Sequence, residues 1–217
     1  METITFSEKN SYADFGLILQ NQEIGEPTPQ THFIKVPYRN GELDLTEAFG
    51  EVAFDDRTNI FTFEYLGNND GWRATLSAFK NYVHGRRHKI FNETNYYWVG
   101  RCNVKASKSS KGIYTITVEC KCEPYKYKLN QTIVEIVATT EVLYTVINDR
   151  KTVTPKITVL SGEPIISWTD KETETSYQNA LASNFDNKIV DLKLYEGSNA
   201  IKVSGGSIRL TYQEASL

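Results

Sequence analysis

Hydrophobic and polar residues alternate along many short stretches of the chain, and this period of two is typical of β-strands with one buried face. The clearest stretch is residues 60–66, where Phe61, Phe63 and Tyr65 fall on one side and polar residues stand between them. Similar patterns predict further strands at 32–36, 89–91, 96–104, 113–122, 133–138, 142–147, 153–160, 165–168, 189–195, 200–203 and 207–212. The chain is therefore predicted to be mainly β.

One stretch, residues 71–83, has instead the period of an amphipathic helix. Its apolar positions recur at spacings of four, three and four residues and form one stripe, which consists of Trp72, Leu76, Phe79 and Val83. Asp70 is a suitable N-cap, because a short polar side chain can accept hydrogen bonds from the free amides of the first turn. Gly85 is expected to end the helix.

The pattern changes near residues 128–131, after which short strands follow at close intervals without a comparable helix. We therefore predict two domains, residues 1–128 and 129–217. The first is expected to be a β-sandwich-like domain with one helix and an extended hairpin arm. The second is expected to be a small β-sandwich or jelly roll, with hairpin turns at residues 196–199 and at Gly205-Gly206.

Composition narrows the classes of function. The chain has 217 residues, of which 40% are hydrophobic and 12% aromatic, and its formal net charge is −3. A weakly acidic protein has no basic field to hold nucleic acid, so specific DNA binding is not expected. No apolar run of about 18 residues exists, so no membrane span is predicted. The polar N-terminus lacks the features of a signal peptide, and we expect folding in a cytoplasm.

Residues that could carry chemistry are sparse. Cys102, Cys120 and Cys122 are predicted to be buried free thiols, because an odd number without framework spacing favours a reducing compartment and Cys-x-Cys lacks the gap of common zinc knuckles. The imidazoles, His32, His84 and His88, have no neighbour in sequence that would make a nucleophile pair. No metal or cofactor is predicted.

Neighbouring carboxylates also favour a non-catalytic interpretation. The pairs are Glu42 with Asp44, Asp55 with Asp56, and Glu172 with Glu174, and all lie in polar turns or on exposed strand faces. General acid–base catalysis needs one desolvated carboxyl group, which these positions do not supply. Gly205-Gly206 leads into a strand and not a helix, so it is not a phosphate-binding loop. The protein is predicted not to be an enzyme.

Three motifs resemble the distal tail protein family of long-tailed bacteriophages. Residues 36–57 read VPYRNGELDLTEAFGEVAFDDR, residues 95–101 read NYYWVGR, and residues 122–128 read CEPYKYK. Residues 194–217, LYEGSNAIKVSGGSIRLTYQEASL, are similar to the last hairpin and strand of that family. The resemblance extends over nearly the whole chain.

The resemblance implies a structural role in the virion. Such proteins form a six-membered ring at the tail tip, between the tail tube protein and the tail-associated fibre or lysin protein. The ring leaves a hole through which DNA passes, and its galectin-like second domain can hold receptor-binding proteins. The chain would then be a homo-oligomer that is assembled in the host cytoplasm and located in the phage tail tip.

An aromatic strand is the candidate for contacts between subunits. Residues 96–99 are apolar or amphipathic on both faces, so either another layer of the same chain or another subunit covers them, and the resemblance favours the subunit. Residues 85–101 are therefore the candidate arm. Asp44 and Thr46 are predicted first to fix a tight corner through bonds to their own backbone. The predicted interface residues are Arg39, Asp44, Arg57, Tyr96, Tyr97, Trp98 and Arg101.

The alternative function is a carbohydrate-binding adhesion module in the C-terminal β-sandwich. A saccharide site would need an aromatic platform beside polar groups, and Trp168 next to Thr169 and Asp170 is the candidate. Trp168 also follows an apolar stretch, which favours a position in the core.

Overall fold

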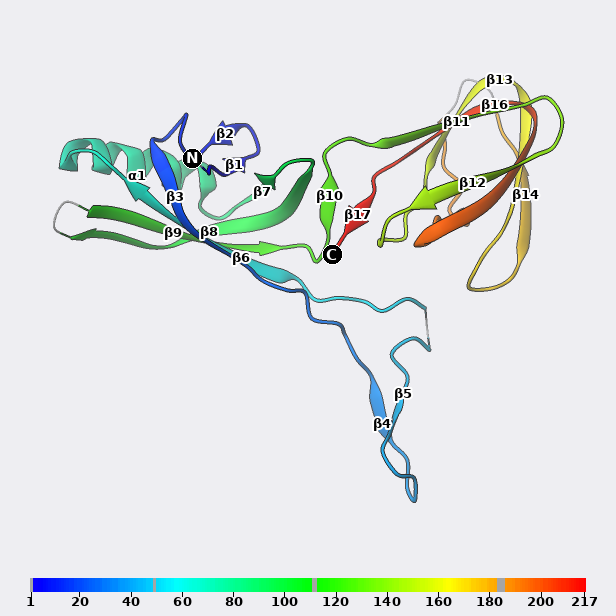
Figure 1. The fold of residues 1–217 in the computed structure, drawn as a ribbon, viewed down its shortest axis with the longest axis horizontal. Helices are drawn as coiled ribbons and strands as arrows, with labels where there is room; N and C mark the ends of the chain where they lie inside the picture. The colour runs from blue at the N-terminus through cyan, green and yellow to red at the C-terminus, as the bar shows by residue number, and fades with distance from the viewer. Residues whose placement is uncertain (1, 49, 111–112, 183–185) are drawn as a thin grey trace. The chain divides into compact units, whose positions relative to one another are not determined.

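The computed structural model describes residues 2–48, 50–110, 113–182 and 186–217, and for residues 106–110 and 186 it describes the backbone alone (Figure 1). Strands dominate these residues, which confirms the prediction of a mainly β protein. Contacts within the chain divide it into two compact units, Met1–Lys126 and Tyr127–Leu217. Each unit has its own hydrophobic core.

The first unit is built on one antiparallel sheet. Its strands follow the order β2-β1-β7-β8-β9-β6-β3. Their bounds are Thr5–Phe6 for β1, Lys9–Asn10 for β2, Leu17–Ile24 for β3, Arg57–Tyr65 for β6, Arg86–Glu93 for β7, Tyr96–Ser110 for β8 and Ile113–Cys122 for β9. The alternation at residues 60–66 thus belongs to an inner strand, β6, whose neighbours are β9 and β3.

Helix α1, Asn69–Val83, packs on one face of this sheet through Trp72, Phe79 and Val83. The predicted helix is confirmed, but the predicted N-cap was wrong. Asn68 occupies that position, because its side-chain oxygen accepts a hydrogen bond of 2.7 Å from the amide of Gly71. Asp70 lies instead in the first turn, where a negative charge is favourable next to the positive end of the helix dipole.

The core between helix and sheet is rich in aromatic rings. Phe6, Phe61, Phe63 and Phe79 are fully buried, and the Phe6 ring lies 5.9–6.3 Å from the other three in edge-to-face arrangements. Burial of each ring stabilises the fold by about 1.5–3 kcal/mol, and each ring pair adds about 0.5–1.5 kcal/mol.

A separate hairpin consists of β4, Phe33–Lys35, and β5, Glu42–Asp44, which pair with each other and not with the main sheet (Figure 1). We call residues 30–48 the arm. The predicted hairpin arm therefore exists, but its predicted place at residues 85–101 was wrong. Those residues form most of β7 and the start of β8, and β8 is paired on both sides, with β7 and β9. A strand paired on both sides cannot project from the sheet.

The second unit is also antiparallel, with the strand order β11-β16-β13-β14, β12 on β16 and β15 on β13. The bounds are Thr132–Ala138 for β11, Val142–Asn148 for β12, Lys156–Thr169 for β13, Ser176–Ala180 for β14, Asp186–Asn187 for β15 and Gly197–Tyr212 for β16. Two short strands, β10 (Lys126–Lys128) and β17 (Ala215–Ser216), pair with each other.

The long strands β13 and β16 bend together at a corner of glycines. Gly162 and Gly205 have φ values of +75° and +77°. A Cβ atom on Gly162 would lie 2.4 Å from the Gly205 carbonyl oxygen, and one on Gly206 would lie 2.3 Å from that of Ser161. Because only glycine fits both the conformation and the space, the strands bend and let one sheet enclose its own core.

The structure corrects four predictions for the second unit. Gly205-Gly206 is a bend inside β16 and not a hairpin turn, and the strands predicted at 153–160 and 165–168 are parts of β13. The predicted turn at residues 196–199 is largely the start of β16. The strand predicted at residues 189–195 is mostly irregular, with one bridge between Leu194 and Val153. Glycine occurs both in turns and in strand bends, so its presence alone did not separate the two.

Candidate interaction surfaces

Asp44 and Thr46 form the corner that closes the arm. The Thr46 amide and hydroxyl both donate to Asp44 Oδ1, at 2.9 and 2.5 Å, and the His32 amide donates to Thr46 Oγ1 at 3.0 Å. The bonds from the Thr46 hydroxyl and amide hold the pKa of Asp44 below its usual value, because they stabilise the carboxylate. The predicted tight corner is confirmed.

The arm exposes large apolar side chains. Tyr38 is fully exposed, and Phe33, Ile34 and Val36 are 51%, 40% and 39% exposed. Apolar side chains gathered on one short hairpin are typical of a surface that a partner covers. Arg39 stands among them and is exposed as well.

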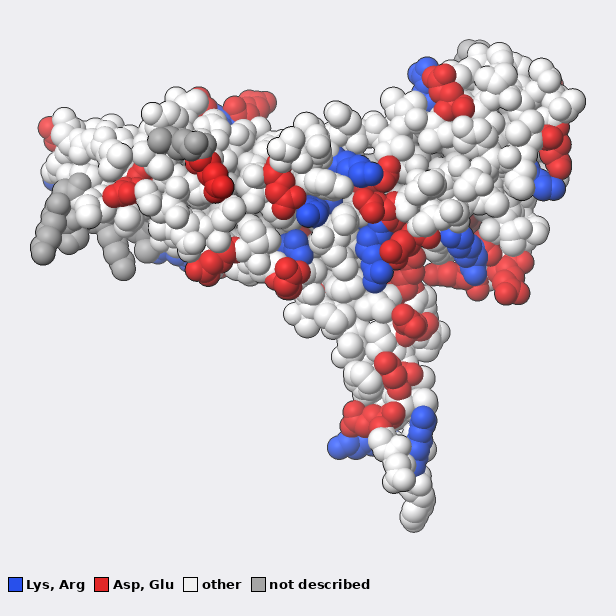
Figure 2. All heavy atoms as spheres, viewed as in Figure 1, with Lys and Arg blue, Asp and Glu red and all other residues white. Residues whose placement is uncertain are grey.

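Acidic residues outnumber basic ones on the arm and on the segment that returns to the sheet. Figure 2 shows acidic side chains along the projecting arm and basic ones close to its tip. The acidic residues are Glu42, Asp44, Glu47, Glu51, Asp55 and Asp56, against Lys35 and Arg39. Lys35 pairs with Glu42 at 3.8 Å, and Asp56 pairs with Lys121 at 3.5 Å.

The sheet face opposite α1 carries basic residues of β7, β8 and β9. A cavity of about 320 Å³ on this face is lined by Asp56, Arg87, Val99, Gly100, Arg101, Asn103, Lys121 and Glu123. Arg87 pairs with Glu123, and Lys121 with Asp56 at 3.5 Å. Arg101 is exposed and donates to the Gly85 carbonyl at 2.5 Å. The charges on this face are therefore largely paired.

The aromatic strand is covered by its own chain. Trp98 is 1% exposed within the core under α1. Tyr97 is 8% exposed on the opposite face, where its ring lies 5.5 Å from Phe91 and Lys89 Nζ lies 4.8 Å from its centre. Tyr96 is half-buried beneath Lys126 Nζ, at 5.1 Å. The sequence left two explanations open for this strand, cover by the same chain or by another subunit. For Tyr97 and Trp98, the same chain provides the cover.

Arg57 is buried as well, with an exposed fraction of 3%. Its guanidinium lies 3.4 Å from Glu26, and its Nε has no hydrogen-bond partner among the described residues. Burial lowers the pKa of Arg57, and Glu26 partly offsets this effect. Of the predicted interface residues, Arg39, Asp44 and Arg101 are thus exposed, while Arg57, Tyr97 and Trp98 lie inside. The interface role of all these residues stays a prediction.

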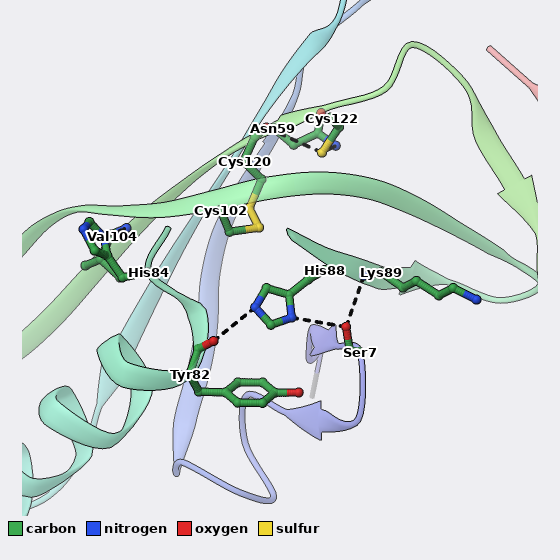
Figure 3. Close-up of a disulfide and its surroundings, with 10 residues drawn as sticks. All are labelled: Ser7, Asn59, Tyr82, His84, His88, Lys89, Cys102, Val104, Cys120 and Cys122. Atoms are coloured by element: carbon green, nitrogen blue, oxygen red, sulfur yellow. Dashed lines mark hydrogen bonds between the residues drawn. A yellow bond between two sulfur atoms is a disulfide. The ribbon is translucent and has the colours of Figure 1, made fainter. Parts of the chain in front are cut away.

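The cysteines correct a prediction. Cys102 and Cys120 form a disulfide between β8 and β9, and Cys122 is free and buried (Figure 3). The prediction of three free thiols was wrong for two of them, because the register places Cys102 directly opposite Cys120 on the inner face. Burial raises the pKa of Cys122 to about 12, so this thiol is unreactive at neutral pH.

The histidines have structural neighbours. His88 is 5% exposed, with Nδ1 3.2 Å from the Ser7 hydroxyl and Nε2 3.2 Å from the Tyr82 carbonyl (Figure 3). Burial lowers the pKa of His88, so the ring is neutral at pH 7. His84 Nδ1 accepts from the Val104 amide at 3.0 Å, and His32 is exposed on the arm. Within the described residues no group of His, Cys, Asp and Glu is arranged to hold a metal ion.

Trp168 is a core residue. It is 6% exposed, its Nε1 donates to the Asp191 carbonyl at 3.2 Å, and its ring stacks on Tyr177 at 5.3 Å with an interplanar angle of 15°. It also lines a cavity of about 510 Å³ in the second unit. The core position that the sequence favoured for Trp168 is therefore confirmed, and its ring forms part of the wall of this cavity.

The structure is similar to the crystal structure of SPP1 Dit (gp 19.1), described as a paradigm of the hub adsorption apparatus in phages that infect Gram-positive bacteria. The match covers 100% of both chains with a TM-score of 0.72 and 13% sequence identity. No protein-family model and no curated protein matches the sequence. The chain therefore has the fold of a phage tail hub protein, and the predicted resemblance to distal tail proteins is confirmed at the level of the fold. Among the described residues, no helix has the length and apolar character needed to span a membrane.

Proposed function

We propose that the protein is a structural subunit of a phage tail tip. The observation that carries the proposal is the likeness to SPP1 Dit, which extends over the whole length of both chains and so includes both units. The motifs at residues 36–57 and 95–101 support the same assignment, because they resemble the distal tail protein family at the level of sequence. In this role the protein acts by assembly and not by catalysis.

We propose further that copies of the chain close into a ring of six. A closed ring needs a heterologous interface, in which two different patches of each subunit meet. The arm supplies one candidate patch, because Phe33 and Tyr38 are exposed on it. The edge strand β3, Leu17–Ile24, is a candidate for the other, since a sheet edge can pair with a strand of a neighbouring copy.

Residues 1–128 form the ring in this proposal, and residues 129–217 face outward. The ring joins the tail tube protein to the tail-associated fibre or lysin protein, and the outer module holds receptor-binding proteins. DNA passes through the hole without specific binding, in keeping with the net charge of −3. The protein is assembled in the host cytoplasm and ends in the virion.

Among the predicted interface residues, the exposed ones are the candidates for direct contact: Arg39 and Asp44 on the arm and Arg101 on the sheet. Tyr96, Tyr97, Trp98 and Arg57 are proposed to support the interface from within, because they fix the strands that carry the exposed groups. Replacing an exposed group should weaken assembly without unfolding the subunit.

The test is the mass and shape of the assembly. The chain is purified alone and after co-expression with the neighbouring tail genes, and both samples are measured by light scattering and negative-stain imaging. Annular particles support the proposal, and Tyr38→Asp should reduce them to monomers. Val137→Asp is a matched control, since Val137 is 73% exposed but lies in the second unit. Monomers in both samples would contradict the ring.

A further inference from the structure

Strand β12 lies at an open edge of the sheet in the second unit. All seven of its residues pair with β16 on one side, and β12 pairs with no other strand among the described residues. In an antiparallel pair, alternate residues turn their amide and carbonyl groups away from the partner strand. The open side of β12 therefore presents backbone groups that a further strand can bind.

The sequence of β12 contains none of the features that usually protect an edge strand. Such strands are commonly guarded by charged residues, proline or a bulge. β12 reads VLYTVIN, and its register with β16 is continuous. The other edge strands of this unit differ, since β11 carries Glu135 in an ion pair with Arg209 at 2.6 Å, and β14 is the short polar segment SYQNA.

Apolar side chains of β12 are exposed on both faces of the sheet. On the outer face, Leu143 and Ile147 are 63% and 66% exposed. On the inner face, which carries the buried Val146, Val142 and Tyr144 are still 37% and 38% exposed. A molecule that lies on one face of the sheet would leave the other face in water. A strand added at the edge covers both, because its side chains continue both faces.

We propose that β12 pairs with β12 of a second copy of the chain, antiparallel and centred on Thr145. In this register Leu143 of each copy lies opposite Ile147 of the other, and Tyr144 lies opposite Val146. Thr145 faces its own counterpart. No residue of VLYTVIN is charged, so no like charges meet, and apolar and Thr–Thr cross-strand pairs are stabilising. The strand is thus complementary to itself, as a two-fold interface requires.

The size of this contact determines when it forms. It involves seven residues of each copy, whereas a standard interface has about 20–30 residues on each side, so two isolated chains should associate only weakly. A two-fold contact cannot join neighbours related by a six-fold rotation, so in the proposed ring it would join two rings. Several such contacts acting together hold far more tightly than one. Pairing between rings rests on the proposed function, but pairing between isolated chains does not.

The test is a doubling of mass with concentration. Sedimentation equilibrium of the full chain and of Tyr38→Asp is measured from about 1 μM to about 1 mM, the range in which a weak contact becomes populated. We expect one chain to become two where no ring forms, and one ring to become two where it does. Because the readout is a doubling, it reports pairing separately from the formation of the ring.

Thr145 provides a matched pair of variants. Thr145→Lys places two ammonium groups opposite each other at the centre of the contact and should abolish the doubling, because like charges directly opposite are destabilising. Thr145→Val keeps a β-branched side chain without charge and should preserve it. Thr145 is exposed, so both variants should fold, and thermal unfolding checks this.

An exchange of charges tests the register. Leu143→Glu alone and Ile147→Lys alone should each weaken the pairing about tenfold, because a charge then faces an apolar side chain. Both changes in one chain should restore it, since each introduced carboxylate faces the introduced ammonium group of the other copy. Lys202 lies directly opposite Leu143 within the sheet and can accommodate the carboxylate in the free chain. Val137→Lys on β11 is the control and should leave the doubling unchanged.

Three outcomes would overturn the proposal: no doubling at any concentration, doubling that persists in Thr145→Lys, or a double variant that pairs no better than the single ones. None of them bears on the ring. Single rings that never double contradict the strand pairing alone, and dimers without rings contradict the ring alone.

Discussion

The arm and the aromatic strand β8 differ in exposure: aromatic side chains of β8 are buried, whereas those of the arm are exposed. Tyr96, Tyr97 and Trp98 make β8 apolar on both faces, and the chain itself covers both. The arm contains fewer aromatic residues, but Phe33 and Tyr38 remain exposed on it. Both faces of an apolar strand can therefore be covered within one chain, here by Phe91 and Lys89 of β7 over Tyr97 and by the core under α1 over Trp98. An exposed hairpin with apolar side chains indicates a surface that another molecule covers.

The largest expected difference between the two regions is in stability. Trp98→Ala should lower the free energy of unfolding by about 3–5 kcal/mol, because it opens a cavity in the core. Tyr38→Ala on the arm should change it by no more than about 0.5 kcal/mol, because the side chain contacts solvent. Urea denaturation of both variants measures this. Similar losses for the two would mean that the arm is part of the folded core.

The disulfide should stabilise the sheet and leave the arm unchanged. Cys102 and Cys120 are 18 residues apart, so replacing both by alanine should cost about 3 kcal/mol through the entropy of the unfolded chain. Cys122→Ala is the matched control, since it removes a buried sulfur without removing a cross-link. Thermal unfolding with and without reductant provides the measurement. Equal losses for the double variant and the control would exclude a cross-link in the purified protein.

A pH titration should distinguish His88 in β7 from His32 on the arm. The folded-state pKa of His88 lies below its ordinary value of 6.5, because burial disfavours the charged ring. The unfolded chain therefore binds the proton first, and stability falls as the pH drops from about 6.5 through the lower folded-state pKa.

Each unit of separation between the two pKa values corresponds to about 1.4 kcal/mol. His88→Gln should flatten this part of the stability profile, whereas His32→Gln should leave it unchanged. An equal effect of both variants would mean that His88 titrates as an exposed residue.

The smallest expected effect is at the corner of the arm. Asp44→Ala removes the acceptor of both bonds from Thr46, and Asp44 is exposed, so global stability should not change measurably. The amides of His32 and Thr46 should nevertheless exchange faster with solvent, as measured by hydrogen exchange, while the amides of β8 keep their rates. Unchanged exchange at His32 would show that the backbone pairing of the arm is sufficient without the carboxylate.

Local patterns predicted much of the fold, because they depend on residues close in sequence. The stripe from Trp72 to Val83 identified the helix, and alternation identified β6 and β9. The Asp44–Thr46 corner was also local, since the bonds span two residues.

Local patterns could not predict features that depend on contacts between residues far apart in sequence. The pairing of Cys102 with Cys120 requires the register of β8 on β9. The bend at Gly205-Gly206 requires that β13 lie across it. Tyr97 is covered by Phe91 and Lys89 of the neighbouring strand, and Trp98 by the core under α1. No local pattern identifies which segment covers a strand. The sequence placed Trp168 after an apolar stretch, but it did not indicate that its ring stacks on Tyr177 of the neighbouring strand.

The glycine corner of the second unit has a consequence for engineering the protein. Gly162 and Gly206 face each other's strands so closely that a methyl group on either collides with the backbone opposite. Neither glycine can be replaced alone. A second substitution cannot relieve the collision, because the atoms in the way belong to the main chain. Variant libraries of this unit should therefore leave the corner untouched and change exposed side chains such as Lys193 and Gln178.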